Sequence, residues 1–350
     1  MLFSKKIAAI DVGTRTLKGL QLCKHKGQVC VDKFFFHDMA TNNELYPLEI
    51  PVYETLKAII QVNGFQNACI TSAPQDNEIL TQDLTLPDMP VKDLRSAIFN
   101  DIETHLNLSA SEISLDYLIL KKLNPEGQIQ NVIKAYCATR QVTDSQIRSL
   151  RAIGLKPRYL ESGILARVAM LIFNGYVTEN KNYVHIDIGE SHISVALISD
   201  GKVVISSVLP TGQGAINKLL FDTNGLPYDQ AEKIKISYDL AAEETSLNKD
   251  DQALIDEIYH QSFYKICRLI DVFKVQLKSD PIYSVQVTGG GSQINNLSKA
   301  LETYCKLPIE IVNPFKNIEI YIRSKIENNS LALIAPYMST AVGLALKDIA

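Results

Sequence analysis

The chain carries the same pattern of apolar and polar positions twice. In each copy an apolar strand leads to Asp-x-Gly, a short polar turn follows, and the apolar alternation resumes in a second strand. The first copy covers residues 7–22 and the second covers residues 183–198, so Asp187 lies 176 residues after Asp11. Further glycine turns, at Gly27 and Gly201, precede a third strand in each copy. A repeat at half the chain length predicts two related halves.

Between the two copies, apolar residues recur with the spacing of a helix. Leu94, Ile98, Ile102 and Leu106 recur every four residues, which predicts an amphipathic helix opening after Pro90. Strands are predicted at 115–121 and 129–138, and a helix at 143–153. Helices are also predicted on either side of this segment, at 52–62 and 162–173. We therefore expect residues 86–157 to form an inserted α-β-β-α subdomain.

The second half is expected to contain a helical subdomain of its own. The predicted helices cover 215–221, 229–242 and 251–277, and a strand at 284–288 then runs into Gly289–Gly291. Later helices are predicted at 294–304 and 336–347. The expected α/β architecture has four parts, which are a first lobe (1–85 and 158–182), the inserted subdomain, a second-lobe core (183–213 and 283–350) and a helical subdomain (214–282).

Composition narrows the class of protein. Of the 350 residues, 46% are hydrophobic and 21% are charged, which is typical of a globular enzyme or assembly protein. The net charge of −4 argues against a dedicated nucleic-acid binder, which would carry a basic stripe. The chain has no run of eighteen apolar residues, so we expect no membrane span. Asp11 interrupts the first apolar run, which argues against a signal peptide and favours the cytoplasm.

The two Asp-x-Gly turns are the first candidate site. Glycine lets the backbone approach a phosphate tail, and backbone N–H groups and hydroxyls can then bind it. Mg²⁺ keeps several waters and takes one or two carboxylates, so Asp11 and Asp187 are candidate metal ligands. The alternative is two ordinary hairpins whose aspartates cap the turns. The half-length spacing favours the phosphate interpretation.

Two further features carry candidate chemistry. The strand-Gly-Gly-Gly-helix pattern at 289–291 lets a ring or a phosphate lie against bare backbone. A Rossmann fingerprint is set aside because Ile294 stands where its third glycine should be. Glu232 and Lys235 share a helix face, which alone is typical of a surface ion pair. His185 and His192 lack metal-ligand spacing, so structural roles are favoured for both.

Taken in order, these features resemble the actin-like ATPase superfamily, in which two related halves hold a nucleotide between their Asp-x-Gly turns. The resemblance implies a two-lobed, duplicated ribonuclease H-like fold with ATP and Mg²⁺ as cofactors. By resemblance, the metal lies at Asp11 and Asp187. The implied phosphate contacts come from a first loop (Asp11, Gly13, Thr14, Arg15, Thr16, Lys18) and a second loop (Gly189, Glu190, Ser191, His192, with Gly212). Glu232 and Lys235 are implied to flank the ribose and the base. The implied adenosine loop consists of Gly289, Gly290, Gly291 and Ser292.

The insertion narrows the resemblance further. Leu86-Pro87-Asp88-Met89-Pro90, the helix after it, Asp116-Tyr117 and the segment 152–157 resemble the extra subdomain shared by PilM and FtsA. The segments 308–315, 335–337 and 343–346 are similar to the PilM family of type IV pilus assembly. The resemblance implies a cytoplasmic scaffold, peripheral at the inner membrane. Its expected partner is the N-terminal cytoplasmic tail of a PilN-type inner-membrane protein, bound between the first lobe and the inserted subdomain. Pilus motor ATPases and self-association are further implied partners, and direct membrane insertion is not expected.

Two alternative functions stay open at this point. One is an FtsA-like filament protein of cell division, and the other is a small-molecule kinase of the same fold. A kinase needs a general base over an acceptor pocket, and the sequence offers no clear Asp for it. The region near Glu161 does not match the water-positioning pattern of the superfamily, so we expect ATP hydrolysis to be weak or absent.

Overall fold

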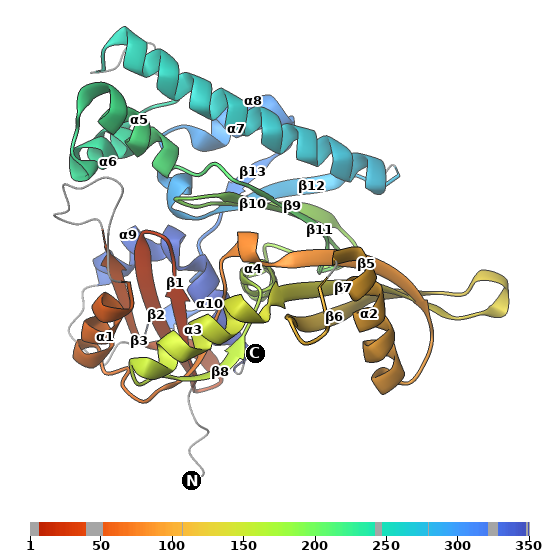
Figure 1. The fold of residues 1–350 in the computed structure, drawn as a ribbon. Coiled ribbons are helices and arrows are strands. Elements are labelled where there is room, and N and C mark those ends of the chain that lie inside the picture. Colours follow the sequence, from red (N-terminus) through yellow and green to blue (C-terminus); the bar gives the residue numbers. More distant parts are fainter. Residues whose placement is uncertain are drawn as a thin grey trace.

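The computed structural model describes residues 7–39, 52–106, 108–241, 247–278, 280–320, 328–347 and 349. Two large sheets are stacked with helices between and outside them, and a third, smaller sheet lies to one side (Figure 1). Within these residues no helix is both long enough and apolar enough to cross a membrane.

The first sheet has the order β14-β3-β2-β1-β4-β8. Its centre is a meander of three antiparallel strands, and β4 then pairs with β1 in parallel. Alternating and β-branched apolar residues favour these strands, as the sequence pattern predicts. The strand bounds are β1 (Ile7–Val12), β2 (Thr16–His25), β3 (Gln28–Asp38), β4 (Cys69–Ser72), β8 (Lys156–Leu160) and β14 (Glu319–Ile320).

The second sheet repeats this topology with the order β11-β10-β9-β12-β13. Here β9 takes the place of β1, and β12 takes the place of β4 as its parallel neighbour. The predicted duplication of two related halves is therefore confirmed. The strand bounds are β9 (Asn182–Ile188), β10 (Ile193–Ser199), β11 (Lys202–Leu209), β12 (Ile282–Thr288) and β13 (Ile309–Ile311).

Two helices, α4 (Gly163–Phe173) and α10 (Ser339–Leu346), pack between the sheets. Their core contains Leu20 and Leu22 from β2 and Ala196 and Ile198 from β10. Both helices are apolar on nearly every side, and most of their residues are buried. They cross closely at Gly343, where a Cβ atom would overlap the carbonyl group of Ala166.

Gly343→Ala should therefore destabilise the protein by about 2–3 kcal/mol, since the backbone of α4 cannot yield to the added methyl group. Helix propensity alone predicts the opposite sign, because alanine is favoured over glycine inside a helix by about 1 kcal/mol. Urea unfolding of the two proteins measures the difference. A midpoint equal to or above that of the wild type would contradict the close crossing of α4 and α10.

The outer faces of both sheets are covered by further helices. On the first sheet these are α1 (Val52–Val62) and α3 (Arg140–Ala152). On the second they are α5 (Gly214–Asn224), α6 (Tyr228–Ser237), α7 (Lys249–Gln276) and α8 (Leu297–Cys305). The long helix α7 runs across the top of Figure 1, and the Asn248 side chain caps it by accepting from the Asp251 N–H at 2.8 Å.

The insert is defined here as β5 (Leu80–Pro87), α2 (Val91–Leu106), β6 (Ile113–Leu123) and β7 (Gln130–Thr139). Its sheet has the order β5-β7-β6, so it gains a strand, β5, that the sequence prediction lacked. The predicted second helix is α3, but Leu150 of α3 packs in the core of the first sheet. We therefore propose bounds near 80–139 for the insert in place of 86–157.

The end of the chain also differs from the prediction. Residues 283–350 were expected in the second-lobe core, but β14 pairs with β3 and α10 packs on β1 and β2. The predicted helix 229–242 ends at Ser237, and residue 242 lies outside the described residues. The helix predicted from 294 begins at Leu297, after the 3₁₀ turn Gly290–Gln293. These differences depend on pairings between distant segments, which periodicity does not report.

Candidate functional site

Two turns with the same backbone hydrogen bond face one cleft. After β1 the Gly13 N–H donates to the Thr16 carbonyl at 3.0 Å, and after β9 the Gly189 N–H donates to the His192 carbonyl at 3.0 Å. A Cβ atom on either glycine would lie within 3.0 Å of the same carbonyl oxygen. Glycine suits this close approach at both positions, and the predicted repeat extends to the geometry of the loops.

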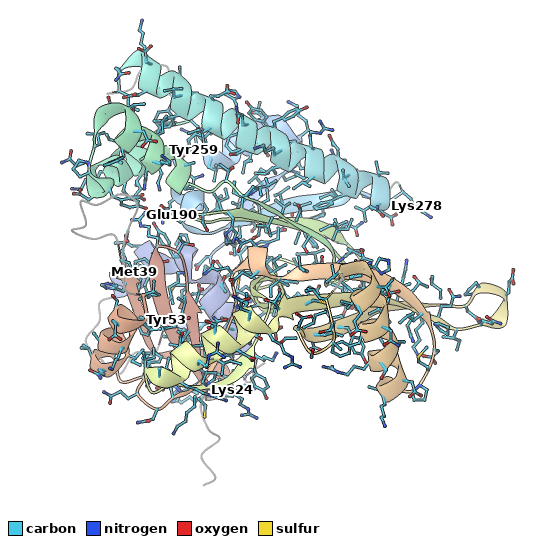
Figure 2. The ribbon with its side chains drawn as sticks, in the orientation of Figure 1. Lys24, Met39, Tyr53, Glu190, Tyr259 and Lys278 are labelled. Atoms are coloured by element: carbon cyan, nitrogen blue, oxygen red, sulfur yellow. The ribbon has the colours of Figure 1, made fainter. Side chains whose placement is uncertain are left out.

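The two loops touch each other across the cleft. The hydroxyls of Thr14 and Ser191 are 3.0 Å apart, and Arg15 Nη1 lies 2.5 Å from Glu232 Oε1 on α6. Glu190 lies between the two large sheets in Figure 2. The enclosed volume is about 130 Å³, below the ~300–1,000 Å³ of typical ligand pockets. The cleft is therefore in a closed conformation.

The cleft is lined by every predicted site residue except Gly212 and Ser292. Gly212 lies behind the second loop, where a side chain would overlap the Glu190 carbonyl group. Ser292 is buried and donates its hydroxyl to the Gly289 carbonyl at 2.7 Å. Both residues are placed to support the loops and not to line the cleft.

The triple glycine brings bare backbone to the cleft wall. Gly289 has φ of 87°, a conformation that favours glycine. A Cβ atom on Gly290 would overlap the Tyr337 ring, and one on Gly291 would overlap the Ile188 side chain. These close approaches explain why three glycines occur in succession. All three glycines line the cleft.

Glu232 and Lys235 were expected to be a surface pair if they had no role in binding. Both are instead buried, and their side chains meet at 2.6 Å. Burial alone raises the pKa of Glu232, but Lys235 and Arg15 outweigh it, so the pKa lies below its ordinary value. Lys235 also lies 3.6 Å from Glu190. A buried, fixed charge cluster therefore closes this end of the cleft.

The carboxylates of the two turns both have cationic neighbours. Asp11 Oδ2 accepts from Lys18 Nζ at 2.8 Å. Asp187 accepts from the Thr288 hydroxyl at 2.7 Å and lies 3.8 Å from Arg167. Burial alone raises the pKa of Asp187, but the positive charge of Arg167 outweighs it, and the pKa is lowered. Asp187 is therefore ionised at neutral pH.

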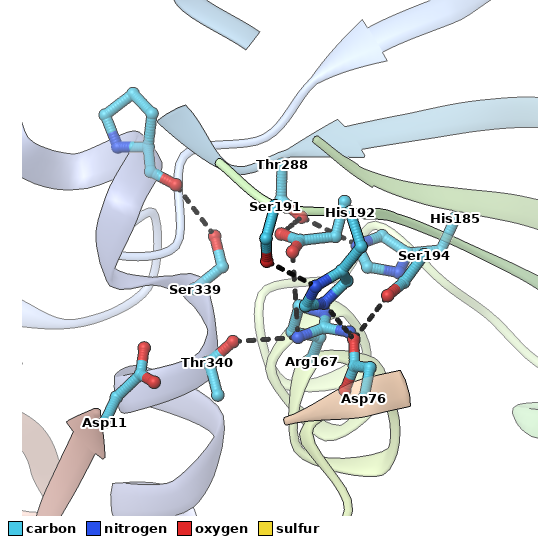
Figure 3. Close-up of polar contacts among 12 residues, drawn as sticks. Asp11, Asp76, Arg167, His185, Ser191, His192, Ser194, Thr288, Ser339 and Thr340 are labelled. Atoms are coloured by element: carbon cyan, nitrogen blue, oxygen red, sulfur yellow. Dashed lines mark hydrogen bonds and ion pairs between the residues drawn. The ribbon is translucent and has the colours of Figure 1, made fainter. Parts of the chain in front are cut away.

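Asp76 and Arg167 are central residues that the sequence reasoning missed. They form an ion pair at the base of the cleft, and each side chain is only 4% exposed (Figure 3). Arg167 also donates to the Thr340 hydroxyl at 3.0 Å, and Asp76 accepts from the Ser194 hydroxyl. The pair therefore joins α4, α10 and both large sheets. One available signal was a lone arginine inside the apolar run 163–173, since buried charges are normally paired.

Other lining residues also escaped prediction, because they come from loops and helix ends that carry no motif. They are Ala73, Pro74, Gln75, Gly163, Gln213, Ile236, Gln293, Ile294, Tyr337 and Thr340.

Acid should destabilise the protein through His185. Its ring is buried and its Nε2 hydrogen-bonds with the Thr288 hydroxyl at 2.8 Å. Burial, then the charge of Arg167, lowers the pKa of His185 to about 3. Between that pH and the unfolded pKa near 6.5, the unfolded chain binds a proton that the folded chain does not. The free energy of unfolding should therefore fall by up to about 1.4 kcal/mol per pH unit as the pH drops through this window.

The measurement is urea unfolding at pH 7 and pH 5 for the wild type and for His185→Gln. Glutamine keeps a hydrogen-bonding side chain but does not titrate, so the variant should lose less stability between the two values. Equal losses would show that His185 does not contribute to the acid sensitivity.

The donor set fits a hydrated Mg²⁺ held by two carboxylates. Asp11 and Asp187 line the same cleft, and Mg²⁺ typically binds one or two carboxylates and keeps several waters. Among the residues that the structure describes, no group of three or more His, Cys, Asp and Glu side chains is placed to hold a metal directly. Any ion here would rely on water and on the phosphates of a nucleotide.

A second, larger hollow lies between the insert and the first sheet, and we call it the groove. Its volume is about 840 Å³. One wall consists of insert residues such as Leu115 and Tyr117, and the other includes Arg158, Leu165 and Lys347. This is the position at which the sequence resemblance predicts a partner groove. The volume is within the range that binds ligands or peptide side chains.

Comparisons with known proteins give the same fold. A chain of the solved PilM-PilN type IV pilus biogenesis complex gives a TM-score of 0.79 at 19% identity, with 98% of each chain covered. The ethanolamine utilization protein EutJ of Carboxydothermus hydrogenoformans gives a TM-score of 0.52 at 14% identity, covering 99% of this chain and 90% of that one. The cell division protein FtsA of Buchnera aphidicola subsp. Baizongia pistaciae is 23% identical, covering 76% of this chain and 68% of its own length.

The predicted two-lobed, actin-like α/β fold is confirmed by these structures. The family model described as "Type IV pilus assembly protein PilM" matches residues 9–349, nearly the whole chain. The protein belongs to the PilM family of type IV pilus assembly proteins.

Proposed function

We propose that this protein binds ATP in the cleft and, as a cytoplasmic scaffold of a type IV pilus or related secretion machine, holds the tail of an inner-membrane partner in the groove. Nucleotide binding would set the closure of the two large sheets and so the affinity for the partner. The observation that carries the first part is the pair of matching glycine turns facing one cleft, with the triple glycine on its wall.

The residues fit a phosphate tail in a specific way. The hydroxyls of Thr14 and Ser191, now bonded to each other at 3.0 Å, would exchange that contact for phosphate oxygens when the cleft opens. Lys18 supplies a cation at the base of the first loop, next to Gly13. The bare backbone of Gly289–Gly291 would accept the adenine ring. Bound Mg²⁺ would neutralise phosphate charge beside Asp11 and Asp187.

The groove and the similarity to a chain of the PilM-PilN type IV pilus biogenesis complex support the proposed partner. A groove with apolar residues such as Leu115 and Leu165 and cations such as Arg158 suits a short peptide with mixed side chains. The N-terminal cytoplasmic tail of a PilN-type inner-membrane protein is the partner that the family membership favours. Through this partner the protein would lie at the inner face of the membrane.

Photo-crosslinking in living cells tests the partner. A benzoylphenylalanine at Leu118, which lines the groove and is 40% exposed, should link to the N-terminal segment of a small membrane protein. The same group at Val62, 86% exposed on α1, is the matched control and should not. Mass spectrometry identifies the linked segment. Equal capture of that protein from both positions would contradict the groove as its binding site.

The FtsA relative favours a second candidate, a filament protein of cell division. The same crosslinking experiment separates the two. Capture of division proteins at Leu118, in place of a pilus protein, would support this second function.

A further inference from the structure

The cleft and the groove share a wall formed by one short segment. Residues 73–76 line the cleft, and Pro74 and Ile79 of the same segment line the groove. The segment then enters the insert directly, since the 3₁₀ turn Asp76–Glu78 is followed by β5 at Leu80. A shift at Asp76 therefore also moves the start of the insert.

Helix α4 forms a second shared wall. Arg167 and Gly163 line the cleft, whereas Leu165, Ala166 and Ala169 line the groove. The helix is packed between the two large sheets and closely crossed by α10 at Gly343. Such a packed helix moves as a rigid body, so a displacement at Arg167 reaches the groove.

The ion pair between Asp76 and Arg167 connects these two walls. It lies beneath the phosphate loops, with Ser194 of β10 as a further donor to Asp76 and His192 Nε2 at 3.9 Å (Figure 3). In the described part of the chain, the buried Nε of Arg167 has no hydrogen-bond acceptor. Arg167 therefore has an unused donor between the two shared walls.

We propose that the Asp76–Arg167 pair transmits nucleotide binding from the cleft to the groove, an inference that rests on the proposed function of the cleft. A phosphate tail is a polyanion, and it competes with Asp76 for the charge and the free donor of Arg167. The pair has to rearrange when the tail enters. The segment 74–79 and α4 then shift against each other, and the groove between them changes shape. Because coupling is reciprocal, occupation of the groove alters ATP affinity by the same factor.

Lys134 of β7 offers a different structural connection between the insert and the second sheet. Its side chain, 3% exposed, joins Asp83 of β5 at 2.6 Å and donates to the Val204 carbonyl of β11 at 2.7 Å. This contact links the insert directly to the second sheet and bypasses the ion pair. Lys134→Met is therefore the matched comparison for a variant of Asp76.

Hydrogen exchange of the full chain, with and without ATP and Mg²⁺, tests the proposal. In the wild type, ATP should change exchange at the groove residues 114–118 and 136–138 by about fivefold or more, the lower end of typical allosteric coupling. Asp76→Asn, compared at an ATP concentration that calorimetry shows to be saturating for it, should change groove exchange by less than about twofold. Lys134→Met should keep the wild-type response. The double variant Asp76→Asn/Arg167→Gln removes both charges of the pair and leaves only Asp187 without its cationic neighbour, so it should fold and should also lack the response.

The possible results are distinct. If Asp76→Asn shows the wild-type change in groove exchange, the role of the ion pair is overturned. The same holds if only Lys134→Met loses that change. ATP binding without any change at the groove in the wild type overturns it as well. No ATP binding by the folded wild type overturns the proposed function of the cleft, and this inference with it.

Discussion

Arg167→Leu should lower the free energy of unfolding by about 3–5 kcal/mol, the usual cost of leaving a buried charge without its partner. The side chain of Asp76 is 4% exposed and accepts from Arg167, and Asp187 lies 3.8 Å from the same guanidinium. Without the arginine, both carboxylates remain in a poorly solvated site next to each other. Urea unfolding at pH 7 measures the loss.

The double variant Asp76→Asn/Arg167→Leu is the control for this prediction. It removes one of the stranded carboxylates, so it should regain a large part of the lost stability, as neutral replacements of buried ion pairs often do. A double variant as unstable as Arg167→Leu alone would show that packing of the arginine stem, and not charge, explains the loss.

Asp187→Ala should reduce ATP affinity in Mg²⁺ by about a hundredfold, equivalent to about 2.8 kcal/mol. Asp187 is one of two cleft carboxylates placed to hold a hydrated ion, and Mg²⁺ commonly relies on so few. Affinity measured in EDTA should change far less. The measurement is calorimetry with ATP in both buffers, after unfolding curves confirm that the variant is folded.

Asp200→Ala provides a matched control. Asp200 lies at the turn between β10 and β11, away from the cleft, where it accepts from the Asn180 N–H at 3.3 Å. Its loss should leave ATP binding unchanged. If Asp187→Ala also retains the wild-type affinity, Asp187 only caps the turn through Thr288.

The features that could be predicted from the sequence are local and repeated. The two Asp-x-Gly turns, the triple glycine and the strands that lead to them are each contained in a short stretch, and their spacing revealed the duplication. The helix 52–62 was predicted with its observed bounds, because its apolar period is clear and its ends carry no conflicting signal. The cleft and most of its lining residues were implied by the family resemblance that these features carry.

The remaining features depend on contacts between distant segments. The ion pair of Asp76 and Arg167 joins residues 91 positions apart, and neither belongs to a recognisable motif. The strand β5 was missed because its exposed and buried positions alternate weakly around two polar residues, Gln82 and Asp83. The return of β14 to β3 spans nearly 300 residues and is set by tertiary packing alone. Periodicity reports which face of an element is buried, but not which partner buries it.

Calorimetric titration of the folded wild-type protein with ATP and Mg²⁺ tests the central claim most directly, namely that the cleft between the paired turns is a nucleotide site. The account predicts saturable binding at one site per chain, competed by ADP. Absence of saturable binding at millimolar ATP, with circular dichroism showing a folded protein, would contradict it.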